Sequence, residues 1–155
     1  MKYFGTEGFR GEANVGLFAF HAYRIGRFLG NYYLNDFQPS QQEPRPRIVI
    51  GKDTRRSSYM LESALTAGIT ASGSDAYLLH VTTTPSVSYC VSSEDFPCGI
   101  MISASHNPFY DNGIKLIGAE GAMMEESILE KIEGYIDSPG DDLPVAVRDG
   151  IGEVR

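Results

Sequence analysis

The sequence has 155 residues, of which 13 are lysine or arginine and 20 are aspartate or glutamate, so the formal net charge is −7. This length suits one folded domain, and a composition of 42% hydrophobic and 21% charged residues is typical of a globular chain. The acidic charge argues against a general nucleic-acid binder, and no apolar run approaches the ~20 residues that a membrane span needs.

Helical and strand patterns alternate along the chain. Helices are indicated where apolar side chains recur every three or four residues, and strands where short β-branched runs occur. The predicted elements, in chain order, are a helix within 17–34, a strand at 47–51, a helix from Ser57 or Ser58 to Gly73, a strand at 76–80, a helix at 85–92, strands at 99–103 and 113–117, and a helix at 125–136. The proline-rich stretch 35–47 and the polar stretch 138–144 predict a surface loop and a domain edge.

This order predicts an α/β domain with a mixed, mostly parallel sheet and helices on both faces. The strand at 113–117 follows the strand at 99–103 after nine residues, which are too few for a helical crossover, so we expect these two strands to be antiparallel. Gly26 and Gly30 lie inside the first helix and weaken it by about 1 kcal/mol each. Close packing against a neighbouring element would explain them.

Unusual polar residues follow the predicted strands, where open α/β sheets bind ligands. Lys52, Arg55 and Arg56 follow the strand at 47–51, and residues 104–113 follow the strand at 99–103. Near the N-terminus, three glycines surround Arg10. Residues 1–116, which hold these candidates, contain 10 basic and 10 acidic side chains. The acidity of the chain therefore does not argue against an anionic substrate.

Ser105 is a candidate nucleophile. Its flanks do not form the Gly-x-Ser-x-Gly turn of a serine hydrolase, and His106 is adjacent in sequence, which is a poor position for its general base. Phosphoryl transfer fits better, because it demands positioning and positive charge. The residues alone leave other interpretations open: a plain turn at 105–108, a solvated cationic face, and a Lys115 that points outward.

Several segments resemble the α-D-phosphohexomutase family. Residues 102–108 (Ile-Ser-Ala-Ser-His-Asn-Pro) and 111–115 (Asp-Asn-Gly-Ile-Lys) resemble its phosphoserine loop, and residues 4–11 (Phe-Gly-Thr-Glu-Gly-Phe-Arg-Gly) resemble its N-terminal arginine loop. The branch that interconverts glucosamine 6-phosphate and glucosamine 1-phosphate is indicated by residues 51–55, 59–65 and 109–113.

The resemblance implies that Ser105 carries a phosphoryl group, donates it to the sugar phosphate and takes back the other phosphate of the bisphosphorylated sugar. A Mg²⁺ ion, bound partly by the phosphate on Ser105, would offset negative charge. Arg10 would clamp phosphate oxygens. Lys115 and His106 would stabilise charge or move a proton on the sugar hydroxyl, and Asn107 would shape the loop and help to bind phosphate.

Two further cations have structural roles in this interpretation, and two residues differ from the usual family pattern. We expect Lys52 and Arg55 to form structural ion pairs rather than to take part in the chemistry. Glu7 stands where the family usually has aspartate, and Phe9 where it has a small aliphatic residue. Either change would alter how the arginine loop packs without removing Arg10.

Members of this family have four domains. Residues 1–150 resemble the first, and 151–155 would begin the linker to the second. The Asp-Gly-Asp metal loop, the sugar-recognition loop and the C-terminal phosphate-binding domain would lie in domains 2–4, so we expect this chain to be inactive as a mutase by itself. The alternatives are phosphoglucomutase or phosphomannomutase specificity, a non-catalytic phosphate- or partner-binding module and, less favoured, a serine hydrolase.

The predicted location is the cytoplasm. The first residues lack the apolar stretch of a secretory signal. Cys90 and Cys98 form neither a zinc-binding spacing nor a disulfide framework, which suits a reducing compartment.

Overall fold

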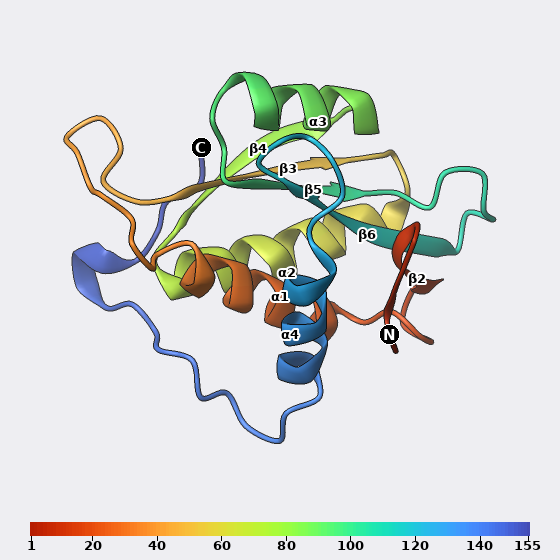
Figure 1. Ribbon diagram of the computed structural model, residues 1–155. Helices are drawn as coiled ribbons and strands as arrows, with labels where there is room; N and C mark the ends of the chain where they lie inside the picture. The colour runs from red at the N-terminus through yellow and green to blue at the C-terminus, as the bar shows by residue number, and fades with distance from the viewer.

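A six-stranded sheet with the strand order β1-β2-β6-β5-β3-β4 organises the computed structural model, which describes residues 1–155 (Figure 1). The strands are β1 (Phe4–Gly5), β2 (Gly8–Glu12), β3 (Arg47–Lys52), β4 (Asp75–Val81), β5 (Cys98–Ile102) and β6 (Asp111–Gly118). The helices are α1 (Ala19–Tyr32), α2 (Arg56–Ser72), α3 (Thr84–Ser93) and α4 (Glu126–Ile136), followed by a 3₁₀ turn at Arg148–Gly150. Helices α1, α2 and α4 lie on one face of the sheet and α3 on the other (Figure 1), so the predicted α/β class is confirmed. None of these helices is long and apolar enough to cross a bilayer.

The strand directions confirm the predicted antiparallel return and add a hairpin. β3 is parallel to β4 and β5, and β6 is antiparallel to β5. Residues 4–12, which we expected only as a loop, form the hairpin β1–β2, and β2 pairs antiparallel with β6. Four strands therefore run one way, and β6 and β1 run against them.

Strand alternation divides the interior into two cores. The larger core lies between the sheet and helices α1, α2 and α4, and it includes Ile50, Ile102 and Ile114. The smaller core lies under α3 and consists of Val49, Val87, Val91, Phe96, Met101 and Ile117. Since neighbouring residues of a strand face opposite sides, β3, β5 and β6 each contribute to both cores.

The start of α2 differs from the prediction. Arg55 occupies the N-cap position, and the predicted caps Ser57 and Ser58 lie inside the first turn. Asp53, two residues before the cap, accepts the Arg55 N–H at 3.1 Å and the Ser58 hydroxyl at 2.7 Å. The carboxylate therefore replaces a serine cap, while Gly73 ends the helix in the left-handed conformation (φ 106°), as predicted.

The segments after α4 stay with the domain. Arg27 of α1 is fully buried and donates to Asp141 and to the carbonyls of Leu143 and Pro144, which holds the predicted domain edge against the first helix. The last residues run beside β4, where Ala76 N–H donates to the Glu153 carbonyl at 2.9 Å. That residues 151–155 lead to a second domain remains a prediction.

Glu133 of α4 anchors the N-terminal hairpin. Its carboxylate accepts the backbone N–H groups of Lys2, Tyr3 and Phe4 at 2.9, 2.8 and 2.7 Å. Partial burial opposes the charged form, but these three hydrogen bonds outweigh it and hold the pKa of Glu133 below its ordinary value of 4.5. The strand that follows Phe4 in the hairpin carries Arg10, so this contact links α4 to the predicted arginine loop.

Helices α1 and α2 touch through glycine, as expected for Gly26 and Gly30. A Cβ on Gly26 would collide with the carbonyl of Leu65, and one on Gly30 would lie 2.8 Å from the carbonyl of Ile69. On the other helix, a Cβ on Gly68 would collide with the Tyr23 carbonyl. The helices therefore approach more closely than any larger residue allows.

We expect Gly68→Ala to lower the free energy of unfolding by about 1–3 kcal/mol, because the added methyl group has no space between the helices. Gly134→Ala is the matched control. Gly134 lies inside α4, where a Cβ meets no atom within 4 Å, so this change should raise the free energy of unfolding by about 0.5–1 kcal/mol. Urea unfolding of the two variants measures both, and equal stabilities would contradict the close contact.

We expect Glu133→Gln to destabilise the chain by about 1 kcal/mol at pH 7, since a neutral amide accepts the three N–H groups less strongly. Because the pKa of Glu133 is lowered by folding, its contribution is complete above pH ~4.5 and is lost as the pH falls through the folded-state pKa. Urea unfolding between pH 7 and pH 3 should show the difference between the variant and the wild type shrinking. A difference that is constant with pH would contradict the role of the charged carboxylate.

Candidate functional site

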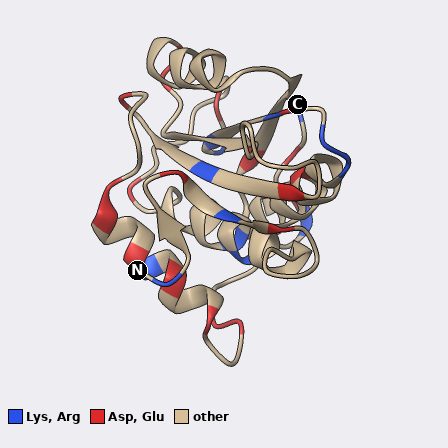
Figure 2. Cartoon of the chain, turned by 90° about the vertical axis from the view of Figure 1, so that its right-hand side faces the viewer, with Lys and Arg blue, Asp and Glu red and all other residues tan.

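The predicted nucleophile lies in the connection between β5 and β6, which we call the Ser105 loop (residues 103–110). This loop projects from the end of the sheet beside the hairpin β1–β2 (Figure 1). Ala104 is fully buried and anchors the start of the loop, whereas residues 105–110 are exposed. Figure 2, which views this side of the molecule, shows basic segments on neighbouring strands of the sheet.

Cross-strand pairing brings the two predicted phosphate-binding cations to one face of the sheet. Arg10 pairs with Gly113, and Lys115 pairs with Met101. Residues 113 and 115 are two apart, so Arg10 and Lys115 face the same side, which is the α3 side because Met101 belongs to the core under α3. Gly99 lets the short helix approach this face of the sheet, since a Cβ there would lie 2.5 Å from Val91 of α3.

A polar hollow of about 120 Å³ remains where α3 begins. It is lined by Glu7, Arg10, Thr84, Met101, Ser103, Ser105 and Lys115. The structure thus brings three of the predicted residues, Arg10, Ser105 and Lys115, to one place. A second, wider hollow on the other side of Ser105, of about 720 Å³, is lined by Asp53, Thr54, Arg55, Arg56, Ser103, Ser105, Asn107 and Phe109.

Ser105 has an unusual backbone and a free hydroxyl. Its φ of 55° places it in the left-handed region, which costs a non-glycine residue about 1–3 kcal/mol. Its N–H donates to Ser103 Oγ at 3.0 Å, and its own hydroxyl makes no hydrogen bond within the chain. The oxygen that would be phosphorylated is therefore exposed between the two hollows.

Arg10 is held against the loop by neutral and charged partners. Its Nη1 donates to the Ala104 carbonyl at 3.3 Å and lies 3.5 Å from Asn107 Oδ1, while Nη2 pairs with Glu7 at 2.9 Å. Its Nε is buried and has no hydrogen-bond partner. Lys115 is half-buried in the same hollow and has no ion-pair partner. The hollow therefore carries one neutralised and one free positive charge beside Ser105.

The remaining predicted residues are divided between the loop and the opposite face. Asn107 Nδ2 lies 3.4 Å from Asp111 Oδ2 and links the loop to β6. His106 is exposed and lines neither hollow, so the structure does not bring it to Arg10 and Lys115. Lys52 is buried and donates to Glu62 at 2.8 Å on the α2 side.

Lys52 and Arg55 both form the ion pairs that we expected. Lys52 lies next to Gly51, which faces α3, and strand alternation turns the lysine away from the site. Arg55 pairs with Asp53 at 2.9 Å and also contacts the Ser105 loop. Arg56 is exposed, has no ion pair and lines the wider hollow.

Three lining residues were missed by sequence reasoning: Thr84, Met101 and Ser103. Thr84 begins α3, and Met101 and Ser103 lie at the end of β5. Their places depend on how α3 crosses the sheet and on the β5–β6 register. No local pattern carries that information, and the predicted antiparallel pairing did not include a register.

The donor set around Ser105 does not form a metal site by itself. The nearby carboxylates Glu7 and Asp53 are already paired with Arg10 and Arg55. No group of three or more histidine, cysteine, aspartate or glutamate side chains is arranged to hold an ion. A hard cation such as Mg²⁺ needs several oxygen ligands, and this chain would offer it only the phosphate of a phosphorylated Ser105.

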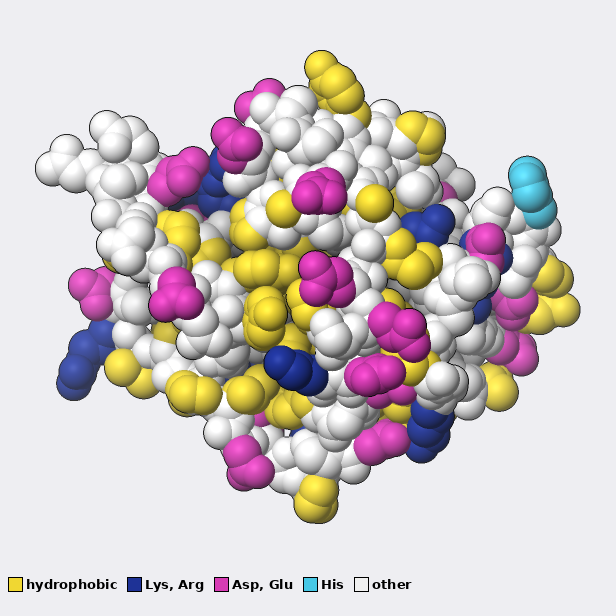
Figure 3. Space-filling model, viewed as in Figure 1, with side chains coloured by type: hydrophobic (Ala, Val, Ile, Leu, Met, Phe, Trp, Pro, Cys, Tyr) yellow, Lys and Arg dark blue, Asp and Glu magenta, His cyan; other side chains and the backbone are white.

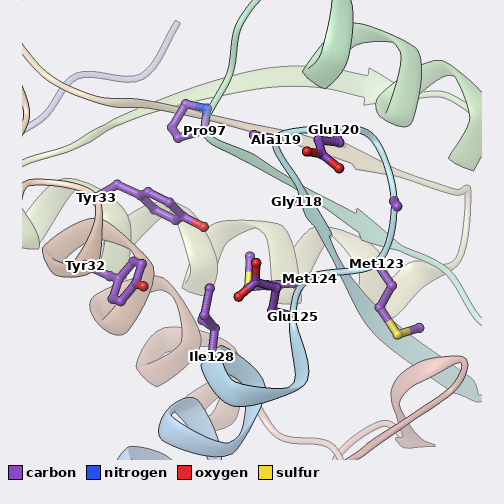
Figure 4. Close-up of a pocket in the computed structure, with 11 residues that line it drawn as sticks. Tyr32, Tyr33, Pro97, Gly118, Ala119, Glu120, Met123, Met124, Glu125 and Ile128 are labelled. Atoms are coloured by element: carbon purple, nitrogen blue, oxygen red, sulfur yellow. The ribbon is translucent and has the colours of Figure 1, made fainter.

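A third hollow of about 360 Å³ lies away from the Ser105 loop, where α1, α4 and the loop after β6 meet (Figure 4). It is lined mainly by apolar side chains, including Tyr33, Met124 and Ile128, with Glu120 and Glu125 at its border. Figure 3 shows apolar side chains gathered on this side, with acidic side chains among them. Without a nucleophile or a cation, this hollow is unsuited to phosphate chemistry.

Comparison with known proteins agrees with this geometry. Residues 1–141 match the family model described as phosphoglucomutase/phosphomannomutase, alpha/beta/alpha domain I. The chain is 62% identical to the phosphoglucosamine mutase of Lachnospira eligens, over 97% of this chain and 33% of that protein. It is 59% identical to the phosphoglucosamine mutase of Lachnoclostridium phytofermentans, over 98% of this chain and 32% of that protein.

The fold agrees as well. A phosphoglucomutase/phosphomannomutase family protein from Burkholderia thailandensis superimposes with a TM-score of 0.74 at 24% identity, over 98% of this chain and 32% of that one. The chain thus spans about a third of the length of the relatives it matches. It belongs to the phosphoglucomutase/phosphomannomutase family, as a domain I of the phosphoglucosamine mutase type.

Proposed function

We propose that this chain is the phosphoserine-bearing domain of an enzyme that interconverts glucosamine 6-phosphate and glucosamine 1-phosphate. The observation that carries the proposal is the setting of Ser105. Its hydroxyl is exposed and without a hydrogen bond, and it lies beside a hollow lined by Arg10 and Lys115. The relatives named phosphoglucosamine mutase support the substrate, and phosphoglucomutase or phosphomannomutase specificity is the alternative.

The reaction consists of two opposite phosphoryl transfers. In the first, a sugar hydroxyl oxygen attacks the phosphorus on Ser105, the bond from phosphorus to Oγ breaks, and the sugar hydroxyl loses its proton while Oγ takes one up. The sugar, which now carries two phosphates, turns around. In the second, Ser105 Oγ loses its proton and attacks the phosphorus of the other phosphate, and the sugar oxygen leaves and takes up a proton. The serine is phosphorylated again, and the sugar phosphate is isomerised.

The residues of the hollow serve these steps through charge and position. The guanidinium of Arg10 would bind phosphate oxygens. Lys115 would stabilise charge on the transferring group through its ammonium, or move a proton on the sugar hydroxyl. We predicted the same role for His106, which would have to act from the solvent side of the loop. Asn107 would keep the loop next to Arg10.

The reaction would also need Mg²⁺ and further domains of the enzyme. The phosphate on Ser105 would help to bind Mg²⁺, which would supply further positive charge, and its other ligands would come from domains 2–4 of the same enzyme. Those domains would also recognise the sugar and its distal phosphate, so the chain alone would be inactive as a mutase. We place the enzyme in the cytoplasm, where the free thiols of Cys90 and Cys98 would stay reduced.

A chimera tests this function. The matching first third of the Lachnospira eligens relative is replaced by this chain, and turnover of glucosamine 6-phosphate is measured. We expect activity in the chimera, one phosphoryl group on Ser105 by intact-mass analysis, and no measurable turnover in Ser105→Ala. Ser63→Ala, at an exposed serine of α2, is the control and should be fully active. Unchanged activity in Ser105→Ala would disprove the proposed role, and a preference for glucose or mannose phosphates would disprove the substrate.

We expect Lys115→Met in the same chimera to lower kcat by about 10²–10⁴-fold, because proton transfer and charge stabilisation are lost. KM should change little, since the other phosphate contacts remain. Lys131→Met, at an exposed lysine of α4, removes an equal charge far from the hollow and should leave kcat unchanged. Steady-state kinetics measure kcat and KM of both variants. Equal kcat values in Lys115→Met and Lys131→Met would contradict the role of Lys115.

A further inference from the structure

We propose that Arg55 is a positioning residue that holds the Ser105 loop in its reactive conformation. This inference rests on the proposed function for its catalytic consequence, but its structural basis is independent of the reaction. The guanidinium of Arg55 donates to three main-chain carbonyls of this connection: to Pro108 at 2.6 Å, to Ser105 at 2.7 Å and to Asp111 at 3.1 Å. One side chain thus binds both the nucleophile residue and the point where the loop enters β6.

The bond to the Ser105 carbonyl acts on the strained residue itself. At a φ of 55°, Ser105 has a backbone conformation that a serine rarely adopts. Arg55 Nη2 donates to the carbonyl oxygen of that plane, while Ser103 Oγ accepts the N–H of the plane before it. The two contacts hold the backbone on both sides of Cα, so together they set the direction in which the Ser105 side chain leaves the main chain.

Arg55 is itself held in place by Asp53. The carboxylate accepts Arg55 Nε at 2.9 Å, the Arg55 N–H at 3.1 Å and the Ser58 hydroxyl at 2.7 Å. Burial opposes the charge of Asp53, but the hydrogen bonds from Ser58 and from Arg55 outweigh it and lower the pKa of this carboxyl. The start of α2, the end of β3 and the Ser105 loop are therefore joined through one ion pair.

The contacts also separate Arg55 from the other cations. Its Nε, Nη1 and Nη2 all donate to Asp53 or to loop carbonyls, so it is already committed before any phosphate binds. Arg10 and Lys115, by contrast, line the hollow, and Lys115 has no ion-pair partner. Arg55 therefore acts through the backbone of Ser105 and needs no contact with the substrate.

Arg24 offers a matched control. Its Nη1 donates to the carbonyls of Tyr135, Ser138 and Gly140, so it also binds three main-chain carbonyls, but in the last turn of α4 and the segment after it. Arg24→Ala should loosen that segment and leave the Ser105 loop unchanged. Both variants lose an arginine that binds three carbonyls, but only Arg55→Ala loses contacts to the Ser105 loop. An effect seen in Arg55→Ala alone therefore comes from those contacts.

The test has two readouts. In the 155-residue chain, amide hydrogen exchange follows the N–H groups of Asn107 and Asp111, which donate to Ala104 and Pro108 inside the loop. We expect exchange at both to accelerate about tenfold or more in Arg55→Ala and to stay unchanged in Arg24→Ala. In the chimera, we expect Arg55→Ala to lower kcat about 10²-fold, because a misplaced nucleophile loses rate while substrate binding remains. KM should change less than about threefold.

A guanidinium or ammonium returned to position 55 should restore part of the lost rate. Arg55→Lys should recover part of kcat, and added methylguanidinium should recover part of the activity of Arg55→Ala and none in Arg24→Ala. If Arg55→Ala is too unstable to measure, Arg55→Lys carries both readouts. Unchanged loop exchange, or equal loss of kcat in the two alanine variants, would overturn the positioning role. If the wild-type chimera is inactive, the proposed function fails, and the exchange data still decide whether Arg55 holds the loop.

Discussion

The antiparallel return from β5 to β6 is the constraint on which this site depends. An eight-residue connection cannot cross the sheet, so β6 must lie beside β5, and its register then determines which side chains meet. Met101 faces Lys115, and Gly113 faces Arg10 on the next strand. A shift of one residue would turn Lys115 into the larger core and expose Ile114. The core of isoleucines on the other side of the sheet therefore maintains the position of the cations.

The same alternation gives neighbouring cations different tasks. Lys52 ends β3 on the side of α2, where it neutralises Glu62 in a buried pair. Arg55, three residues later, has left the strand and bonds to the backbone of the Ser105 loop. Arg10 and Lys115 alone face the hollow. Two of these four cations are therefore needed to build the site and two are available to meet an anion, although all four look alike as positive charges in the sequence.

Sequence reasoning identified the helices, the strands β3 to β6 and the β5–β6 pairing, because periodic apolar patterns and short connections report on them directly. It missed the hairpin β1–β2, whose glycine-rich residues show no alternation and which becomes a strand only by pairing with β6. It also missed the cap of α2, since Asp53 lies outside the usual cap position, and the burial of Arg27. Within the site, Ser105, Arg10 and Lys115 were found from motifs, whereas Thr84 and the carbonyl contacts of Arg55 depend on tertiary packing that no local pattern encodes.

The borders of the sheet have a consequence for association between copies of the chain. Unpaired strand edges are templates for aggregation, yet β1 offers only two residues on one side. On the other side, residues 153–155 already bond to the first half of β4, and the second half is irregular, with a register shift at Gly51 opposite His80 and a left-handed backbone at His80. A bulge of this kind twists an edge away from straight pairing. Neither border presents a long flat strand, so the sheet is protected from growing by edge-to-edge addition.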